Sequence, residues 1–289
     1  MSGRWERLMV KRGVVRCLGR IVWYDVCRSI PQCIPLYCVS FAVLAVLAAR
    51  YDANVELIGL APSPSEVLAS FLLGSNPFDP DAGSVFVVPP TWFALNVSVA
   101  CLVGFYPCSD YRASGCQVIS RCRSTQLWFL GKEIWAMLVV FILYGGLLIL
   151  CAVFGAGNGG LDSEVRMNVV AFDWNGESVD LNVLEALCVQ ISVSIALSIV
   201  QVAISLLTGP PVAMGVIVAY FIASCFFGGI PFVADCGMIL RSSFCAPNGY
   251  DFLSCLSMCL LSAAVIIVTS AIVLRNVDFG LNLKNVDTE

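Results

Sequence analysis

The sequence predicts an all-α integral membrane protein, and three observations support this fold class. Of the 289 residues, 59% are hydrophobic and only 12% are charged, whereas soluble domains are about half apolar and about a quarter charged. The mean hydropathy is +0.88. Six apolar runs contain no Asp, Glu, Lys or Arg, and each is long enough to approach or cross a hydrocarbon core about 30 Å thick as a helix. These runs lack the alternation of polar and apolar residues that a membrane β-barrel requires, so we expect helices.

The expected organisation has three parts. Residues 1–32 are a basic amphipathic segment in which Arg and Lys interleave with apolar residues at helical spacing, and we expect a helix lying at the membrane interface. Residues 33–274 are a transmembrane domain, and residues 275–289 are a cytoplasmic tail. The six expected spans lie at about 33–49, 85–106, 134–154, 186–207, 212–233 and 252–274.

The distribution of Lys and Arg predicts the orientation of these spans. Seven lie in the first 32 residues, four lie between the second and third spans, and two lie in the tail, whereas each of the other three loops has one. Thirteen cations against three predict that the first group of segments is cytoplasmic, because cytoplasmic loops of membrane proteins are enriched in Lys and Arg. We therefore expect a multi-pass protein of the cell membrane with both termini in the cytoplasm.

The composition argues against catalysis in this chain. The sequence has no His, and its many Cys have no zinc-site spacing and fall mostly inside apolar runs, where Cys behaves as a small hydrophobe. None of the six expected spans contains an ionisable group that could serve as an acid, a base or a proton carrier. We expect no catalytic residue, no cofactor, no metal site and no nucleic-acid partner.

Two features are candidates for a structural or functional role. Polar residues spaced by 4, 4, 3 and 4 lie on one face of the fourth expected span, and they would line a translocation path or a dimer seam, or hold helices together by hydrogen bonds. These residues are Gln190, Ser194, Ser198, Gln201 and Ser205. In the loop before the sixth span, Cys236 and Cys245 are a candidate disulfide on the oxidising side, with two free thiols as the alternative.

The stretch that leads into the third span resembles the permeases of type 2 ABC transporters. Many of these carry a cytoplasmic Ser-Arg, Arg, Trp and Lys series just before the third of six spans. The positions that carry the resemblance here are Ser120, Arg121, Arg123, Trp128 and Lys132. The basic N-terminal segment, the six spans and the interrupted segment after the fifth span are similar to that class as well.

The resemblance implies a function and partners. Such permeases bind no nucleotide themselves; a separate ATPase subunit docks on the loop between the second and third spans and drives alternating access in a permease dimer. Arg121, Arg123, Trp128 and Lys132 would then form the docking loop, and a second permease subunit, identical or not, would complete the dimer. An amphiphilic or peptide-like substrate is expected, because no span carries a charge. The alternative is a membrane scaffold, assembly or immunity subunit that transports nothing.

Overall fold

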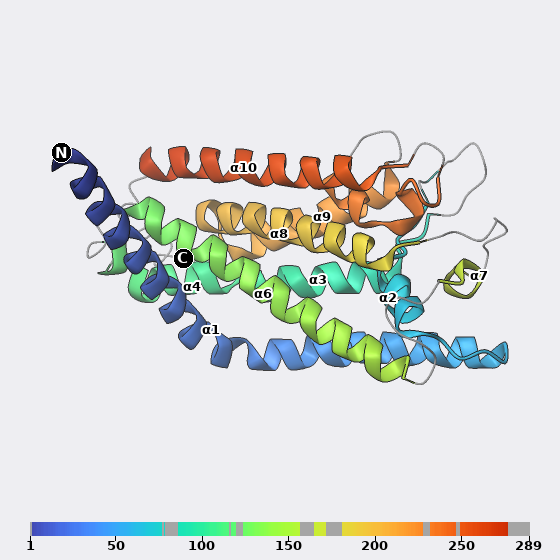
Figure 1. Cartoon of the computed structure of the whole chain (residues 1–289). Helices are drawn as coiled ribbons and strands as arrows, with labels where there is room; N and C mark the ends of the chain where they lie inside the picture. The colour runs from blue at the N-terminus through green and yellow to red at the C-terminus, as the bar shows by residue number, and fades with distance from the viewer. Residues whose placement is uncertain are drawn as a thin grey trace.

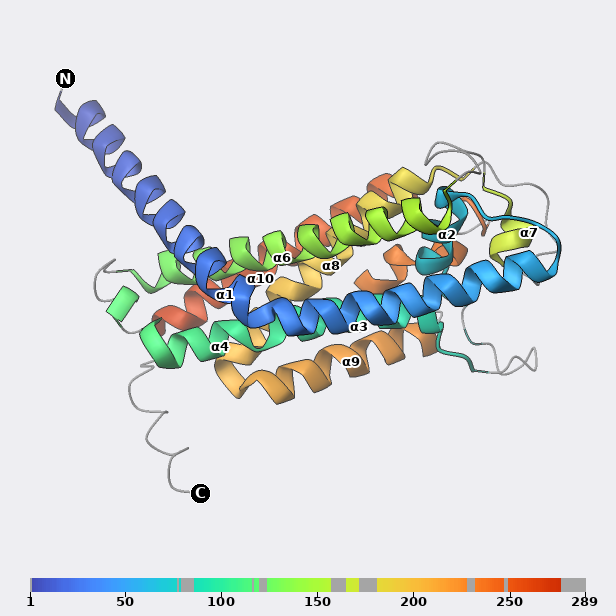
Figure 2. The ribbon, with the colours of Figure 1, turned by 90° about the horizontal axis from the view of Figure 1, so that it is seen from below.

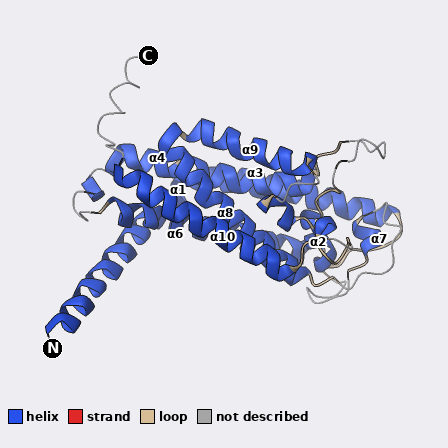
Figure 3. Ribbon diagram, turned by 90° about the horizontal axis from the view of Figure 1, so that it is seen from above, coloured by secondary structure: helices blue, strands red, loops and turns tan. Residues whose placement is uncertain are grey.

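The computed structural model describes residues 2–76, 78, 86–115, 117–119, 124–156, 165–171, 181–227, 232–246 and 249–276. The described part of the chain is mostly helical and contains no strand (Figure 3). Five helical segments within the described residues are long and apolar enough to cross a membrane: Val15–Leu57, Pro90–Ala113, Thr125–Phe154, Val183–Thr208 and Phe252–Ser270. The chain is thus an all-α protein with the helices of a membrane-embedded protein, as the composition predicts.

The first helix, α1 (Ser2–Leu57), is a single helix of 56 residues. At about 1.5 Å per residue it is far longer than a bilayer core is thick, and its N-terminal part leaves the bundle at an angle (Figure 2). Pro31 and Pro35 lie inside the helix, where each removes a backbone hydrogen bond and favours a bend. The expected boundary at residue 32 is therefore not an interruption of the helix, and the expected end at residue 49 is too early.

The other long helices also differ from the apolar runs at their ends. The second expected span is α3 (Pro90–Gly104), followed by the short α4 (Tyr106–Asp110) and the π-helical turn η1 (Tyr111–Gly115). The fourth and sixth are α8 (Val183–Thr208) and α10 (Phe252–Asn276). The fifth, α9 (Pro210–Phe226), has 17 residues and ends before the expected Val233. Gly209 begins α9 with a φ of 98°, a backbone conformation that favours glycine.

The third span shows the most consequential difference. Helix α6 (Thr125–Phe154) begins nine residues before the expected Ile134 and therefore includes Lys132 and Glu133. Ser124 caps it, because its Oγ accepts a hydrogen bond from the backbone N–H of Leu127 at 3.2 Å. The apolar run alone marks only the part of the helix without charge.

The long helices run between two ends of an elongated bundle (Figure 1). The end where α4 and the start of α6 lie, together with the start of α1, is called the α4 end below. The opposite end, called the α2 end, carries α2 (Pro64–Leu72), α7 (Met167–Val170) and the 3-10 turns η2 (Val233–Gly237) and η3 (Ile239–Arg241). Helix α8 lies at the centre and packs against α3, α6, α9 and α10.

Candidate functional site

A buried group of charged side chains lies at the α4 end, where α1, α4 and α6 meet. Lys132 of α6 is fully buried and its Nζ donates hydrogen bonds to Asp25 of α1 and, at 2.6 Å, to Oδ2 of Asp110 at the end of α4. Asp25 and Asp110 are also buried, with 0% and 2% exposure. One ammonium group therefore joins three segments that are distant in sequence, and we call these three residues the Lys132 cluster.

Aromatic side chains surround the Lys132 cluster. The hydroxyl of Tyr106 donates a hydrogen bond to Oδ1 of Asp25 at 3.0 Å. The ammonium group lies 5.0 Å from the ring centroid of Tyr106 and 5.2 Å from that of Trp128, within the range of a cation–π interaction. A buried charge is costly unless it is paired and hydrogen-bonded, and these contacts meet that requirement for Lys132.

Helices α1 and α6 pack closely, and this brings Lys132 within reach of Asp25. A Cβ atom on Gly131 would lie 2.6 Å from Cγ2 of Ile21, and one on Gly146 would lie 2.3 Å from the ring of Phe41. Both glycines therefore permit the two helices to approach, as small residues commonly do between membrane helices. Trp135 adds a hydrogen bond from its Nε1 to Oγ of Ser29 at 2.6 Å.

Arg28 balances the charge of the Lys132 cluster and reaches the surface. Arg28 of α1 lies 3.9 Å from Oδ1 of Asp110 and has a side chain that is 35% exposed. Two cations thus face two carboxylates, one cation buried and one at the rim. Such an arrangement positions the three helices relative to one another.

Glu133, the neighbour of Lys132, is a second buried charge-bearing residue of α6. It is fully buried, and among the described residues neither of its carboxylate oxygens has a hydrogen-bond partner. The expectation that no ionisable group lies within a span holds for the apolar runs but not for the helix, since α6 begins earlier than its run.

The five polar residues of α8 all lie in the interior, with exposures of 0–2%. Nε2 of Gln190 donates to Oδ1 of Asn96 at 2.9 Å and to the hydroxyl of Tyr144 at 3.1 Å. That hydroxyl lies 2.8 Å from Oγ of Ser194. These bonds join α8 to α3 and α6 of the same chain, which favours helix-to-helix packing over a seam with a second subunit.

The remaining three positions of this face are also buried but differ in their partners. Nε2 of Gln201 donates to the backbone carbonyl of Ala100 at 2.7 Å, and Oγ of Ser205 donates to the carbonyl of Val202 at 3.0 Å. Oγ of Ser198 is buried with no hydrogen-bond partner among the described residues. The predicted inward orientation of the face agrees with the structure, while a translocation path stays a prediction.

Two arginine–carboxylate pairs lie at the α2 end. Arg166 binds Glu66 through two donors, with Nε to Oε1 at 2.6 Å and Nη2 to Oε2 at 2.9 Å. Glu66 also accepts the backbone N–H of Ser63 at 2.9 Å and so completes a capping box for α2. Burial raises the pKa of Glu66, but the hydrogen bonds from Arg166 and Ser63 outweigh it, so the pKa lies below its ordinary value.

The second pair closes α9. Arg241 lies 2.8 Å from Oδ1 of Asp235, and its Nη atoms donate to the carbonyls of Ser224 and Cys225 at 2.8 and 3.2 Å. These carbonyls belong to the last turn of α9, where backbone acceptors have no partner within the helix. Arg166 and Arg241, two of the three basic residues outside the predicted cytoplasmic segments, thus stabilise the fold.

The predicted docking residues fall into two groups: two lie outside the described residues and two are buried. Arg121 and Arg123 lie outside the described residues. Trp128 and Lys132 are 1% and 0% exposed, so their side chains face the protein interior and do not offer a docking surface. The reason is that α6 begins at Thr125 and turns both residues towards α1 and α4, where Lys132 finds two carboxylates.

The candidate disulfide is not formed. Cys236 and Cys245 are both free thiols, and Cys236 instead lies in one buried cluster with Cys255 and Cys259 of α10. Within the part of the chain that the structure describes, no group of three or more potential ligands has the geometry of a metal site.

No protein-family model, no curated protein and no solved structure matches this chain. Any function proposed for this chain therefore rests on its own residues and geometry.

The Lys132 cluster was not found from sequence. Asp25 and Asp110 lie 107 and 22 residues from Lys132, and both lie in segments that are otherwise counted as cytoplasmic. The available signal was weak but present: Lys132 and Glu133 directly precede the most apolar run, and Asp110 lies four residues after the end of another.

Proposed function

We propose that this chain is the transmembrane permease subunit of an ATP-driven exporter of the type 2 ABC class. It has no catalytic site of its own in this proposal; a separate cytoplasmic ATPase subunit hydrolyses ATP, and a second permease subunit completes a dimer. The sequence resemblance before α6 suggests the class, and the geometry at the α4 end supports the mechanism.

The observation that carries the proposal is the Lys132 cluster. A loop that receives motion from a partner must be rigidly connected to the helices that move. Residues 111–124 lie between α4 and α6, and Lys132 links α6 to Asp110, one residue before this loop, and to Asp25 of α1. In this proposal Lys132 is therefore the anchor of the docking loop, while Arg121 and Arg123 of the loop contact the ATPase.

The proposed topology has six spans with both termini in the cytoplasm. Helix α9 counts as the fifth span, although its 17 residues give only about 26 Å of helix. The basic residues favour this orientation, since thirteen of the sixteen Lys and Arg belong to the N-terminal segment, the loop before α6 and the tail. The α4 end is then cytoplasmic and the α2 end faces outward.

The dimer and the substrate follow from the surfaces of the helices. Large apolar side chains of α1, α6 and α10 are exposed, among them Val46, Ile149 and Leu261 at 67–68%. These faces would contact lipid and the second subunit. An amphiphilic or peptide-like substrate fits better than a small ion, because the polar groups of the central helices are neutral amides and hydroxyls.

The test is copurification of the tagged chain from membranes in mild detergent, with identification of its partners and an ATPase assay. We expect a nucleotide-binding subunit in stoichiometric amount. Arg121→Glu combined with Arg123→Glu should reduce its recovery at least severalfold without reducing membrane insertion. Arg50→Glu, a charge reversal on an exposed residue near the α2 end of α1, is the matched control and should leave recovery unchanged.

Two results would count against this proposal. Recovery of the chain alone, or with a partner that has no ATPase activity, would favour a membrane scaffold or assembly subunit. A thiol reagent that does not cross membranes tests the topology separately: it should label Cys245 in intact cells and spare the exposed Cys27 of α1. The reverse pattern would overturn the orientation.

A further inference from the structure

Three cysteines from two segments meet at the α2 end. Cys236 belongs to η2, and Cys255 and Cys259 lie one turn apart on α10. All three side chains belong to one cluster of buried residues. The three residues are 7%, 3% and 1% exposed. Cys in the core of a membrane protein commonly behaves as a small hydrophobe, but thiols that lie close together have redox chemistry available to them.

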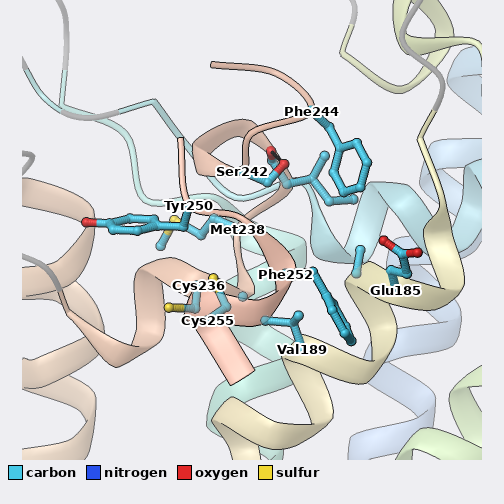
Figure 4. A pocket seen from close by; sticks show the side chains of 12 residues that line it. Glu185, Val189, Cys236, Met238, Ser242, Phe244, Tyr250, Phe252 and Cys255 are labelled. Carbon is cyan, nitrogen blue, oxygen red and sulfur yellow. Dashed lines mark hydrogen bonds between the residues drawn. The ribbon is translucent and has the colours of Figure 1, made fainter. Parts of the chain in front are cut away.

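Two of these thiols line a pocket that opens to the surface. The pocket is a partly open hollow whose empty space of about 350 Å³ includes open solvent, and it lies between the start of α8, residues 236–244 with Tyr250, and the start of α10. Cys236 and Cys255 lie side by side in its wall (Figure 4). Cys259 does not line the pocket. A small molecule in the pocket would therefore reach the first two sulfurs and not the third.

The neighbouring thiols favour the thiolate form of Cys236. Hydrogen bonding by Cys255 and then by Cys259 lowers the pKa of Cys236, although burial opposes this. The thiolate is the nucleophile in thiol–disulfide exchange, so Cys236 is the attacking residue and Cys255, its neighbour in the pocket, is the resolving residue.

We propose that this pocket is a thiol–disulfide exchange site that takes small organic disulfides carrying a positive charge. The Cys236 thiolate attacks one sulfur of the disulfide, its S–S bond breaks, and one half leaves as a thiolate. Cys255 gives up its proton and attacks the Cys236 sulfur of the mixed disulfide, which releases the second half. The two cysteines are oxidised by two electrons to a Cys236–Cys255 disulfide, and the organic disulfide is reduced to two thiols.

The lining of the pocket selects the charge of the ligand. Phe244, Tyr250 and Phe252 supply aromatic surface, and Glu185 is the one charged residue among the described residues of the lining (Figure 4). An ammonium group is attracted by a carboxylate and by aromatic faces, whereas an acidic disulfide is repelled. The product disulfide would fasten the segment before η3 to α10 and so stiffen the α2 end.

The experiment uses the purified full-length chain in detergent and two probes of similar size: cystamine, which is cationic, and dithiodiglycolate, which is anionic. Remaining thiols are alkylated at intervals, and the digested protein is analysed by mass spectrometry. We expect cystamine to yield a peptide pair linked through Cys236 and Cys255, and to react about tenfold faster than dithiodiglycolate. Glu185→Gln should remove most of this preference.

Variants separate the two roles. In Cys255→Ser the adduct of cysteamine should stay on Cys236, whereas in Cys236→Ser the reaction at Cys255 should become much slower. Cys245→Ser, a change at a thiol of the same loop that does not line the pocket, should leave the product unchanged. A link from Cys236 to Cys245 or Cys259, or equal rates for the two probes, would overturn the proposal. The experiment needs no ATPase, so its outcome is independent of the permease proposal.

Discussion

The two ends of the bundle both bury ionic groups, but they use different cations for different contacts. At the α4 end, Lys132 places one compact charge between carboxylates of α1 and α4. At the α2 end, Arg166 and Arg241 use the fork of the guanidinium group to bind a carboxylate together with backbone carbonyls. Lysine suits a narrow space between close helices, and arginine suits irregular segments whose carbonyls need donors. The ion pairs at the α4 end therefore connect helices to one another, and those at the α2 end connect loops to helices.

The largest expected effect comes from removing the cation of the α4 end. Lys132→Met leaves Asp25 and Asp110 buried without their shared partner, and we expect it to lower the free energy of unfolding by about 3–5 kcal/mol. Thermal unfolding in detergent measures this. Arg112→Met, a change at an exposed residue of the same end, should cost less than about 0.5 kcal/mol. Adding Asp25→Asn and Asp110→Asn to Lys132→Met should restore much of the loss; no recovery would mean that the ion pairs are not its source.

Replacing arginine by lysine at the α2 end, and lysine by arginine at the α4 end, tests whether each end needs its own kind of cation. Arg241→Lys keeps the charge near Asp235 but loses most of the donors to Ser75, Ser224 and Cys225, so we expect a cost of about 2 kcal/mol. Lys132→Arg keeps the charge at the α4 end but must fit a larger group into a fully buried site, at a cost of about 1–3 kcal/mol. If either exchange is neutral in thermal unfolding, the geometry of that cation is unimportant.

Acidification should affect the α2 end through Glu66. The pKa of Glu66 is lower in the folded protein than in the unfolded chain, so the folded state binds fewer protons. The resulting stabilisation is complete above the ordinary pKa of Glu and is lost as the pH falls through the lowered value. Between about pH 5 and about pH 3, Glu66→Gln should therefore show a flatter loss of stability than the unaltered chain. Parallel curves would show that Glu66 does not titrate in this range.

The smallest expected loss of stability comes from the neutral hydrogen bonds in the middle of the bundle. Tyr144→Phe removes the hydroxyl that contacts Gln190 and Ser194, and hydrogen bonds between membrane helices average about 0.6 kcal/mol. We expect a destabilisation of that size in thermal unfolding, well below the effect of Lys132→Met. A cost near that of Lys132→Met would mean that the neutral network in the middle matters as much as the charged ends.

The fold was largely predictable, and the site was not. Apolar runs mark α3, α6, α8, α9 and α10 because the cost of placing charge in lipid leaves a clear signature in sequence. The same signature misplaced the start of α6 and separated residues 1–32 from a helix that is continuous to Leu57. A charge ends the apolar run but not the helix, and it can be buried where a distant partner neutralises it; periodicity within one segment carries no information about that partner.

The sequence by itself determined that the chain is helical and membrane-embedded, because hydrophobicity and charge are local properties of each segment. It also determined that Gln190 to Ser205 share one face of α8, since their spacing follows the turn of a helix; the structure showed that this face is buried within the chain. Only the tertiary structure decided that Lys132 is an interior anchor and that Cys236 meets Cys255. Both depend on which helices approach one another, and that is settled by packing between residues far apart in the chain.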